Sequence, residues 1–346
     1  MKIQAVFVLT LASAVLVGIS SGQNRVLSFF TWSEYIDPAI IKSFEKKFSV
    51  QVKTTLYESN EDMLSKLKAG GKGQYDIIVP SDYIVPVLIG NRLLQKLDSA
   101  KIPNLKNLDK QFLGTPVDPE NQYGAGYQWG TTGILYRKDK FKTTPNSWAI
   151  YFDPKQQPGA FMMMDDPRVT IGSALKYLGK SLNSTSLTDL QAAEKLLSNA
   201  KKRSKGFTVG IAGKSQVESG NVDMAVVFNG DGVRAMNDNK NLAFFVPKEG
   251  SMIALDFMMI PAIAPSAALA HQFINYILEP KIGAQLSNYT QYGTPNTAAK
   301  PFLNPKDLKN VAIYPTAATM QNLEYIQDLG KNSRLYDAVW TKIKAK

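Results

Sequence analysis

Patterns typical of strands and of helices alternate along the first part of the chain. The strand-like runs are residues 24–32, 50–58 and 75–81, and the runs with apolar side chains at helical spacing are residues 37–48 and 60–70. The helical runs begin at Asp37 and Asn60, which are residue types that cap helices. This alternation predicts an α/β domain with a largely parallel sheet.

The rest of the chain continues the alternation. Residues 122–139, rich in glycine and aromatic side chains, predict a pair of strands. Further strands are expected at 160–166, 223–231, 241–250 and 253–265, and helices at 168–179, 187–203, 266–280, 317–330 and 334–346. The predicted fold class is therefore α/β throughout.

Aromatic and acidic residues follow two of the predicted strands. Trp32, Glu34 and Tyr35 come at the end of the first strand, and Asp82 and Tyr83 follow the strand at 75–81. Ligands of open α/β sheets bind beyond the carboxyl ends of the strands. These residues are therefore candidates for a binding site.

The first residues have the pattern of a secretory signal peptide, a lysine followed by an apolar run and then small residues. We expect it to span residues 1–22, so that the mature protein begins at about Gln23 and is soluble. The chain contains no cysteine, which excludes disulfides and thiolate chemistry. A secreted chain without disulfides fits a bacterial periplasm.

The net charge of +11 does not by itself point to another class of protein. Basic residues cluster only at 201–205 and at the C-terminus, without interleaved aromatic residues. We interpret them as a solvated basic face and expect no nucleic-acid partner.

Signals for catalysis or metal binding are lacking. His271 is the only histidine and there is no cysteine, which excludes a Cys–His pair and argues against a histidine-rich metal site. No G-x-S-x-G, P-loop or G-x-G-x-x-G motif occurs. We therefore expect no enzyme activity, no cofactor and no metal.

Acidic residues stand at further strand ends. Asp166 precedes Pro167 and a predicted helix, so it is equally well interpreted as a helix cap or as a ligand-binding acid. Asp256 interrupts an apolar strand, where an unpaired charge is costly. Its partner is either a basic residue of the protein or a cationic ligand.

Three segments combine an aromatic ring with an acid, and they are Trp32–Glu34–Tyr35, Asp82–Tyr83 and Phe228–Asp231. Aromatic faces attract cations and cover methylene groups. Carboxylates accept strong hydrogen bonds from ammonium groups. The combination therefore favours an alkyl ammonium ligand.

Ten segments, in order, resemble the periplasmic spermidine/putrescine-binding proteins of ABC importers. Four of them are "TWSEYIDP" (31–38), "YDIIVPS" (75–81), "LDFMMIP" (255–261) and "YGTPN" (292–296). The resemblance extends over nearly the whole mature chain, so it is more specific than any single motif.

The resemblance implies a two-lobed periplasmic-binding-protein fold with the ligand cleft between lobes that close by a hinge motion. Lobe one is expected to comprise residues 24–131 plus 257–300, and lobe two residues 132–256 plus 301–346. It also implies the function: a monomer that captures putrescine or spermidine in the periplasm and delivers it to the membrane permease of an ABC importer.

The resemblance further implies a set of ligand-binding residues. Asp166, Asp231 and Asp256 match pocket acids, and Gln327 or its neighbour Ile326 matches a pocket glutamine. The full expected set is Trp32, Glu34, Tyr35, Ser81, Asp82, Tyr83, Asp166, Phe228, Asp231, Asp256, Tyr292 and Gln327.

The chain departs from the family pattern at three pocket positions. Val169 stands where a glutamate is usual, Ala254 where a large aromatic is usual, and Phe228 where a tryptophan is usual. Loss of one charge-assisted hydrogen bond costs about 1.5–3 kcal/mol of binding free energy. The scaffold is therefore expected to bind either a polyamine or a different small organic amine or amino acid.

Overall fold

The computed structural model describes residues 25–69, 73–208 and 211–345. The predicted signal peptide, residues 1–22, lies outside the described residues. Within the described ranges, no helix is long and apolar enough to cross a bilayer.

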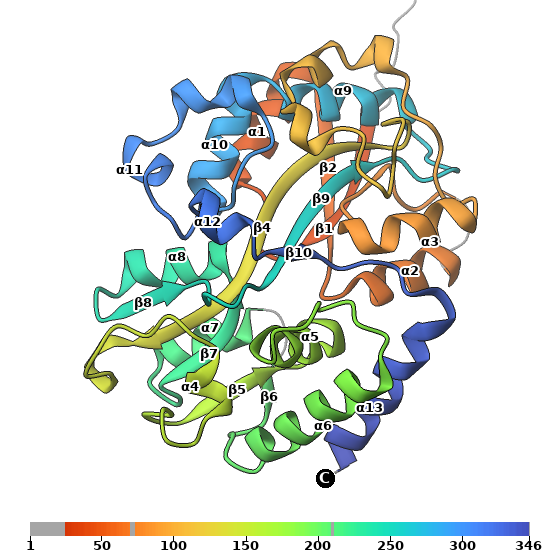
Figure 1. The fold of residues 1–346 in the computed structure, drawn as a ribbon. Helices are drawn as coiled ribbons and strands as arrows, with labels where there is room; N and C mark the ends of the chain where they lie inside the picture. The colour runs from red at the N-terminus through yellow and green to blue at the C-terminus, as the bar shows by residue number, and fades with distance from the viewer. Residues whose placement is uncertain (1–24, 70–72, 209–210, 346) are drawn as a thin grey trace, which may run out of the picture.

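Ten strands form one mixed sheet that runs through two lobes (Figure 1). The strands are β1 Arg25–Trp32, β2 Val50–Tyr57, β3 Ile77–Ile78, β4 Gly124–Arg137, β5 Phe161–Met164, β6 Phe207–Thr208, β7 Met224–Phe228, β8 Leu242–Phe245, β9 Met252–Met259 and β10 Glu324–Tyr325. The order is β2-β1-β3-β9-β4-β7-β5-β6, with β10 paired to β9 and β8 paired to β4.

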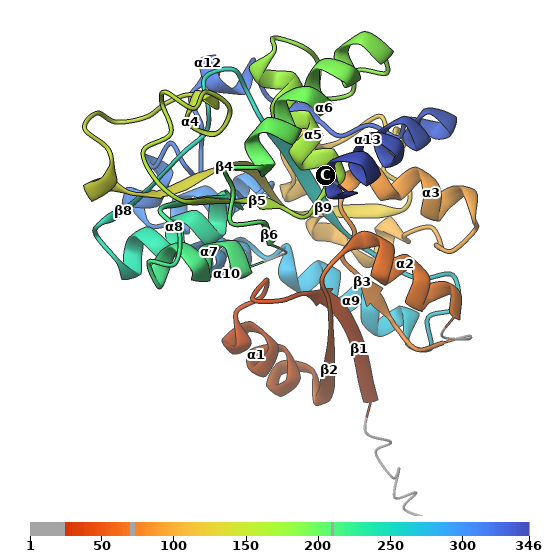
Figure 2. The ribbon, with the colours of Figure 1, turned by 90° about the horizontal axis from the view of Figure 1, so that it is seen from below.

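Thirteen α-helices of the described residues cover this sheet. They are α1 Pro38–Phe48, α2 Asn60–Ala69, α3 Val85–Gly90, α4 Ala149–Phe152, α5 Pro167–Tyr177, α6 Leu187–Lys201, α7 Ala212–Glu218, α8 Asn229–Asp238, α9 Ala267–Ile277, α10 Pro280–Thr290, α11 Pro305–Leu308, α12 Ala317–Met320 and α13 Ser333–Ala345. Figure 2 views lobe two from below, where α13 lies beside α5 and α6.

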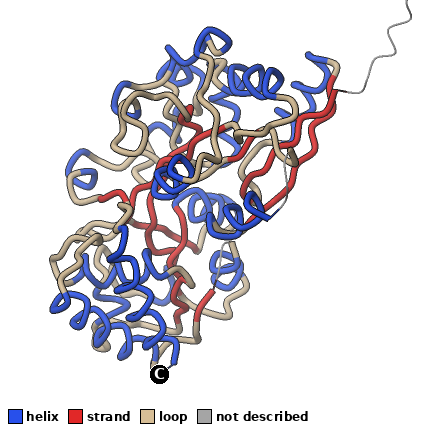
Figure 3. Tube along the Cα trace, turned by 90° about the vertical axis from the view of Figure 1, so that its right-hand side faces the viewer, coloured by secondary structure: helices blue, strands red, loops and turns tan. Residues whose placement is uncertain are grey.

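The sheet combines parallel pairs around β1 and β5 with antiparallel pairs around β4 and β9. In lobe one, β1 pairs in parallel with β2 and β3, and in lobe two β5 pairs in parallel with β6 and β7. Strands β4 and β9 are antiparallel partners that join the two parts, as Figure 3 shows from the side. The prediction of a largely parallel sheet is therefore correct around β1 and β5, whereas β4 pairs antiparallel with β7, β8 and β9, and β3 pairs antiparallel with β9.

The glycine-rich segment 122–139 forms one long strand and not the predicted pair. Strand β4 pairs with β9 over residues 124–131 and with β7 and β8 over residues 132–137. Its glycines permit close packing and mark no turn. A Cβ at Gly133, for example, would lie 2.4 Å from the ring of Phe244.

The start of α1 is as predicted, because the Asp37 carboxylate accepts from Ala39 N at 2.8 Å. At α2 the cap is Ser59, whose hydroxyl accepts from Asp62 N, and not Asn60. The Asn60 side chain is buried and accepts a hydrogen bond from Ser81 N. The predicted capping residue therefore ties α2 to the segment that follows β3.

The predicted helix at 317–330 is mostly wrong. Only α12 forms there, and the chain then extends so that β10 pairs in parallel with β9. Ile326, next to β10, is buried in the core of lobe two. A short strand segment thus replaces a helix because the edge of β9 offers it main-chain partners.

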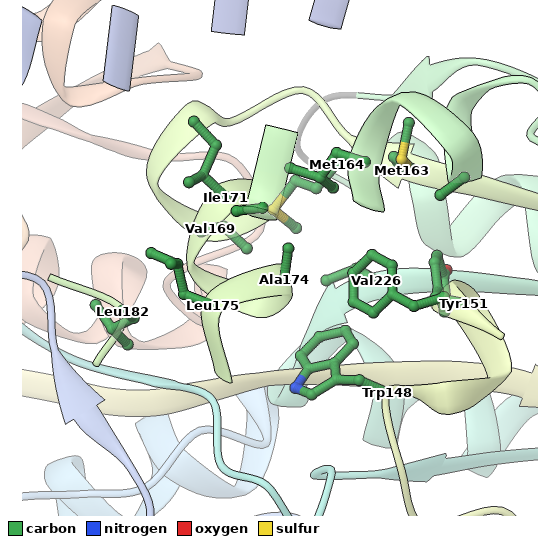
Figure 4. Packing of buried hydrophobic residues seen from close by; sticks show 14 of the residues in the cluster. Trp148, Tyr151, Met163, Met164, Val169, Ile171, Ala174, Leu175, Leu182 and Val226 are labelled. Atoms are coloured by element: carbon green, nitrogen blue, oxygen red, sulfur yellow. The ribbon is translucent and has the colours of Figure 1, made fainter. Parts of the chain in front are cut away.

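Each lobe has its own apolar cores. Buried side chains from β1, β3, α1 and α9 pack together in lobe one, and those from β5, α5, α6 and α13 pack together in lobe two (Figure 4). Ile253 and Leu255 of β9 belong to a core of lobe one. The exact residue boundaries of the two lobes stay a prediction.

His271 is a structural residue. It is buried on α9, where its Nε2 accepts from Asp98 N at 2.9 Å and its Nδ1 lies 2.7 Å from the carbonyl oxygen of Ala267.

A close approach between α8 and the buried ring of Tyr292 generates a prediction for Gly230. A Cβ at Gly230 would lie 2.2 Å from Tyr292 Cε2, and this ring is itself packed against Tyr35. We expect Gly230→Ala to lower the free energy of unfolding by about 1–3 kcal/mol through overpacking, measured by urea denaturation. Gly90→Ala is the control, because a Cβ there meets nothing within 4 Å. A fully stable Gly230→Ala protein would contradict the tight contact.

Candidate functional site

The centre of the candidate site is the carboxylate of Asp256 on β9. Tyr35, in the loop after β1, donates its hydroxyl to Asp256 Oδ2 at 2.5 Å. The other oxygen, Oδ1, is buried and has no hydrogen-bond partner among the described residues. Burial raises the pKa of Asp256 to about 6, while the neighbouring Ser81 and Tyr35 side chains oppose the rise. One carboxylate oxygen is thus held by the protein and the other is left for a donor.

Buried polar groups hold Tyr35 in place. Its carbonyl oxygen accepts from the Tyr127 hydroxyl at 2.8 Å and from Gln128 Nε2 at 3.2 Å. Gln128 also lies opposite Asp256 in the β4–β9 register. The sequence analysis missed Gln128, although a polar residue inside an apolar glycine-rich strand was an available signal.

Ser81 and Asp82, which follow β3, have different roles. Ser81 forms a β-bridge with Asp256, so it lies beside the central carboxylate. Asp82 is buried, and its carboxylate accepts from Tyr83 N at 2.7 Å and from Leu255 N at 3.3 Å. Burial raises the pKa of Asp82 to about 8, and the negative charge of Asp256 adds to the rise. Asp82 is therefore largely protonated at neutral pH, and its hydrogen bonds from Tyr83 N and Leu255 N join the segment after β3 to β9.

Aromatic rings surround the central carboxylate. Tyr292 packs edge-on against Tyr35 with ring centroids 5.1 Å apart. Trp32 donates its indole N–H to Val79 O at 2.9 Å and packs against Tyr57. Phe228, half-buried at the end of β7, packs against cores of both lobes. Tyr292 thus lies beside Tyr35, Trp32 packs beside Tyr57, and the ligand-binding role of these rings stays a prediction.

Two predicted acids are paired with a basic residue of the protein. Arg234 on α8 lies 2.6 Å from Asp231 and 2.9 Å from Glu34. Burial raises the pKa of Asp231, and the positive charge of Arg234 counteracts it. The sequence analysis missed Arg234 because it expected a strand through Asp231 and no helix there, whereas α8 begins at Asn229 and brings residues three apart together.

Asp166 is both a cap and a neighbour of a second acid. Its carboxylate accepts from Val169 N at 2.9 Å and caps α5. Burial raises the pKa of Asp166, the Val169 N–H opposes this, and the charge of Glu61 raises it further. Glu61, on α2 of lobe one, also accepts from the Tyr83 hydroxyl at 3.1 Å. The sequence analysis missed Glu61, a carboxylate contributed from the opposite lobe.

Val169 replaces the family glutamate with an apolar packing residue. It is 4% exposed and belongs to the apolar core of lobe two (Figure 4). At this position, where the resemblance implies a glutamate, the chain therefore has a core side chain and no carboxylate.

Gln327 is not brought to the central carboxylate by any contact of the described residues. Its side chain is exposed, its carbonyl oxygen accepts from Arg168 Nη1 at 3.0 Å, and its N–H donates to Asn183 at 2.9 Å. Its role in binding stays a prediction, as do the roles of the other predicted site residues.

Other chemistry finds little support in the described part of the chain. No group of three or more histidine, cysteine or acidic residues there is arranged to hold a metal ion. A surface hollow lined by Lys66, Lys68, Arg92 and apolar residues shares no residue with the candidate site.

A two-lobed α/β fold, with rings and acids from both lobes at the junction, defines a solute-binding protein. The chain belongs to the family of bacterial extracellular solute-binding proteins, which it matches over residues 39–318. It is 33% identical over 338 residues to the spermidine/putrescine-binding periplasmic protein of Escherichia coli (strain K12), covering 96% of this chain and 97% of that protein.

Further relatives agree with this assignment. The chain is 33% identical over 358 residues to the putrescine-binding periplasmic protein SpuD of Pseudomonas aeruginosa (strain UCBPP-PA14), covering 97% and 96% of the two chains. The PotD substrate-binding protein from Streptococcus pneumoniae has a TM-score of 0.83 at 31% identity, covering 93% of this chain and 99% of that one. The Tp0655 (TpPotD) lipoprotein of Treponema pallidum has a TM-score of 0.81 at 28% identity, covering 93% and 100%.

The raised pKa of Asp82 predicts how stability depends on pH. Its folded-state pKa of about 8 exceeds the ordinary value of 3.8, so the folded protein keeps a proton that the unfolded chain has lost. Stability is therefore lost as pH rises toward 8. Between pH 6 and pH 8 we expect the wild type to lose about 2 kcal/mol more unfolding free energy than Asp82→Asn, measured by urea denaturation.

The control for this measurement is Asp139→Asn, which removes an exposed carboxylate paired with Arg137. It should keep the wild-type slope. Parallel slopes for the wild type and Asp82→Asn would show that Asp82 is ionised in the folded protein.

Proposed function

We propose that this protein is the substrate-binding component of an ABC importer. It captures a polyamine, putrescine or spermidine, in the periplasm and delivers it to a membrane permease. The observation that supports this proposal most directly is the buried Oδ1 of Asp256, which has no hydrogen-bond partner among the described residues. The printed names of the E. coli and P. aeruginosa relatives support the choice of ligand class.

The chemistry of Asp256 suits one ammonium group. An ammonium carries three donors and a full positive charge. It completes the hydrogen bonding of Oδ1 and stabilises the ionised carboxylate against the cost of burial. Tyr35 keeps Oδ2 occupied, so the carboxylate cannot rotate freely away from the ligand. The surrounding rings cover the methylene groups of the amine.

The acids around Tyr83 offer a second place for a cation. Asp166 of lobe two and Glu61 of lobe one each raise the pKa of the Tyr83 hydroxyl, after the larger effect of burial. Two carboxylates from opposite lobes repel each other when the lobes approach, and an ammonium between them relieves the repulsion. Ligand binding thereby favours the closed arrangement that a permease recognises.

The protein acts as a monomeric carrier and not as an enzyme in this proposal. Its candidate site combines acids with rings and contains no nucleophile–base pair of the kind that catalysis needs. The positive net charge does not prevent amine capture, because salt screens distant charges over about 8–10 Å while the acids of the site act at contact.

Binding of putrescine and spermidine tests the proposal, with Asp256→Asn as the central variant. We expect millimolar putrescine or spermidine to raise the melting temperature of the wild type, because the ligand binds only the folded state. In calorimetric titrations Asp256→Asn should bind at least about tenfold more weakly, since it loses a charge-assisted hydrogen bond.

The matched control is Asp337→Asn, which removes one negative charge from an exposed position on α13. Lys202→Gln tests the basic run at 201–205 in the same way. Both should bind like the wild type. No thermal shift and no heat with either polyamine would refute the proposed ligand class, and equal losses in all three variants would refute the central role of Asp256.

A further inference from the structure

Exposed apolar side chains gather in one part of the chain. Eight large apolar side chains of the described residues are exposed, and four of them are Tyr289, Phe302, Leu308 and Val311. They come from α10, from the 3-10 helix Thr297–Phe302, and from α11 and the residue run after it, at one edge of the molecule (Figure 1). Single exposed apolar residues are ordinary, whereas a group of them among polar residues marks an interaction surface.

Contacts between these elements bring the side chains together. Lys281 Nζ on α10 lies 5.8 Å from the centroid of the Phe302 ring. Asn288, also on α10, donates to Phe302 O at 3.4 Å and accepts from Asn304 N at 3.0 Å. Leu308 N then donates to Asn304 O at 3.2 Å. The outer side of α10, Phe302 and the start of α11 therefore lie beside one another.

The charge of this region is positive. Its basic side chains are Lys281, Lys300, Lys306 and Lys309, and all four are exposed. The one acid within residues 280–311 is Asp307. Its carboxylate is buried and accepts from Gln291 Nε2 at 3.2 Å and from Asn304 Nδ2 at 3.0 Å. The acid thus stabilises the turn between α10 and α11 and leaves the surface to the lysines.

Acids from other elements neutralise only part of this charge. Asp109 lies 3.7 Å from Lys300, and Asp37 accepts from Gln285 of α10 at 2.8 Å. The other three lysines form no ion pair within the part of the chain that the structure describes. The exposed apolar side chains are therefore surrounded by uncompensated positive charge.

We propose that this surface binds a bilayer of anionic phospholipids. We call it the α10–α11 patch, and it consists of Lys281, Tyr289, Phe302, Lys306, Leu308, Lys309 and Val311. The ammonium groups attract the phosphate headgroups, and the apolar side chains enter the headgroup region. The long lysine stems can lie along the apolar surface while their charges stay in water. The proposal concerns a different surface from the amine site and does not depend on the ligand.

The composition of the α10–α11 patch favours lipid over a protein partner. The centres of protein–protein interfaces are depleted in lysine and enriched in arginine. Residues 280–311 contain lysine as their only basic residue type, and Lys306 and Lys309 alternate along the chain with the apolar Phe302, Leu308 and Val311. A compact ammonium on a flexible stem suits the diffuse charge of headgroups and not a fixed set of partners.

Flotation of the full mature chain with lipid vesicles tests the proposal. At low salt we expect the wild type to bind vesicles of equal parts phosphatidylglycerol and phosphatidylcholine at least about tenfold more tightly than vesicles of phosphatidylcholine alone. About 1 M salt should abolish this binding, because it screens the headgroup charge. Lys281→Gln/Lys306→Gln/Lys309→Gln should weaken it at least about tenfold. Phe302→Ser/Leu308→Ser/Val311→Ser should weaken it at least about threefold, since the apolar insertion is lost.

Matched controls remove the same groups elsewhere. Lys195→Gln/Lys202→Gln/Lys205→Gln removes three exposed charges on and after α6, and Leu187→Ser removes an apolar side chain that is 62% exposed. Both should bind vesicles like the wild type. If the triple serine variant fails to fold, Val311→Ser replaces it, because Val311 is the most exposed apolar residue of the patch. The thermal shift with putrescine should stay unchanged in every folded variant.

The absence of wild-type binding to the anionic vesicles overturns the inference, and so do equal losses in the two lysine variants. Binding to inner-membrane vesicles of the source bacterium that protease treatment of those vesicles abolishes would assign the patch to a membrane protein, and would also overturn it. None of these results bears on amine binding, which the titrations with putrescine and spermidine test separately.

Discussion

The buried carboxylate of Asp256 is the constraint on which the rest of the site depends. It lies on β9, one of the two strands that join the lobes, and it keeps only part of its hydrogen bonding within the protein. An ionised carboxylate in such surroundings is costly unless a cation completes it. Tyr35, itself held by Tyr127 and Gln128, fixes one oxygen and leaves the other for a ligand. The fold thus maintains a charge whose natural complement is an ammonium group.

Much of the fold could be predicted from local signals. The helix after β1 follows from Asp37 and the apolar spacing behind it, and the α/β class follows from the alternation of elements. The failures arose where tertiary contacts override local patterns. The glycines of β4 resemble turn residues, yet they lie within a continuous strand. At Gly133 a larger side chain would collide with the ring of Phe244. Residues 317–330 were expected to form one helix, yet the helix ends at Met320 and β10 pairs with β9 in the sheet.

The site was predictable in its composition but not in its pairing. Rings and acids after strand ends indicated which segments meet: Tyr35 and Ser81 lie beside Asp256, and Tyr292 packs against Tyr35. Sequence cannot show which acids are already neutralised, because that depends on side chains brought from elsewhere in the fold. Arg234 pairs with Asp231 and Glu34. The buried Asp82 carboxylate accepts a hydrogen bond from the backbone at Leu255. Glu61, which accepts from the Tyr83 hydroxyl, belongs to the other lobe. Each of these interactions depends on the tertiary structure or on the electrostatic surroundings of the side chain, which local sequence patterns do not show.

The most direct test of the account is the proton exchange that accompanies putrescine binding at pH 6. With a pKa of about 6, Asp256 is half protonated in the unliganded protein, and an ammonium at Oδ1 lowers that pKa. Titration calorimetry in buffers of different ionisation enthalpy should show release of at least roughly half a proton per ligand, and clearly less in Asp256→Asn. Binding of putrescine to the wild type without proton release would contradict a ligand seated on this carboxylate.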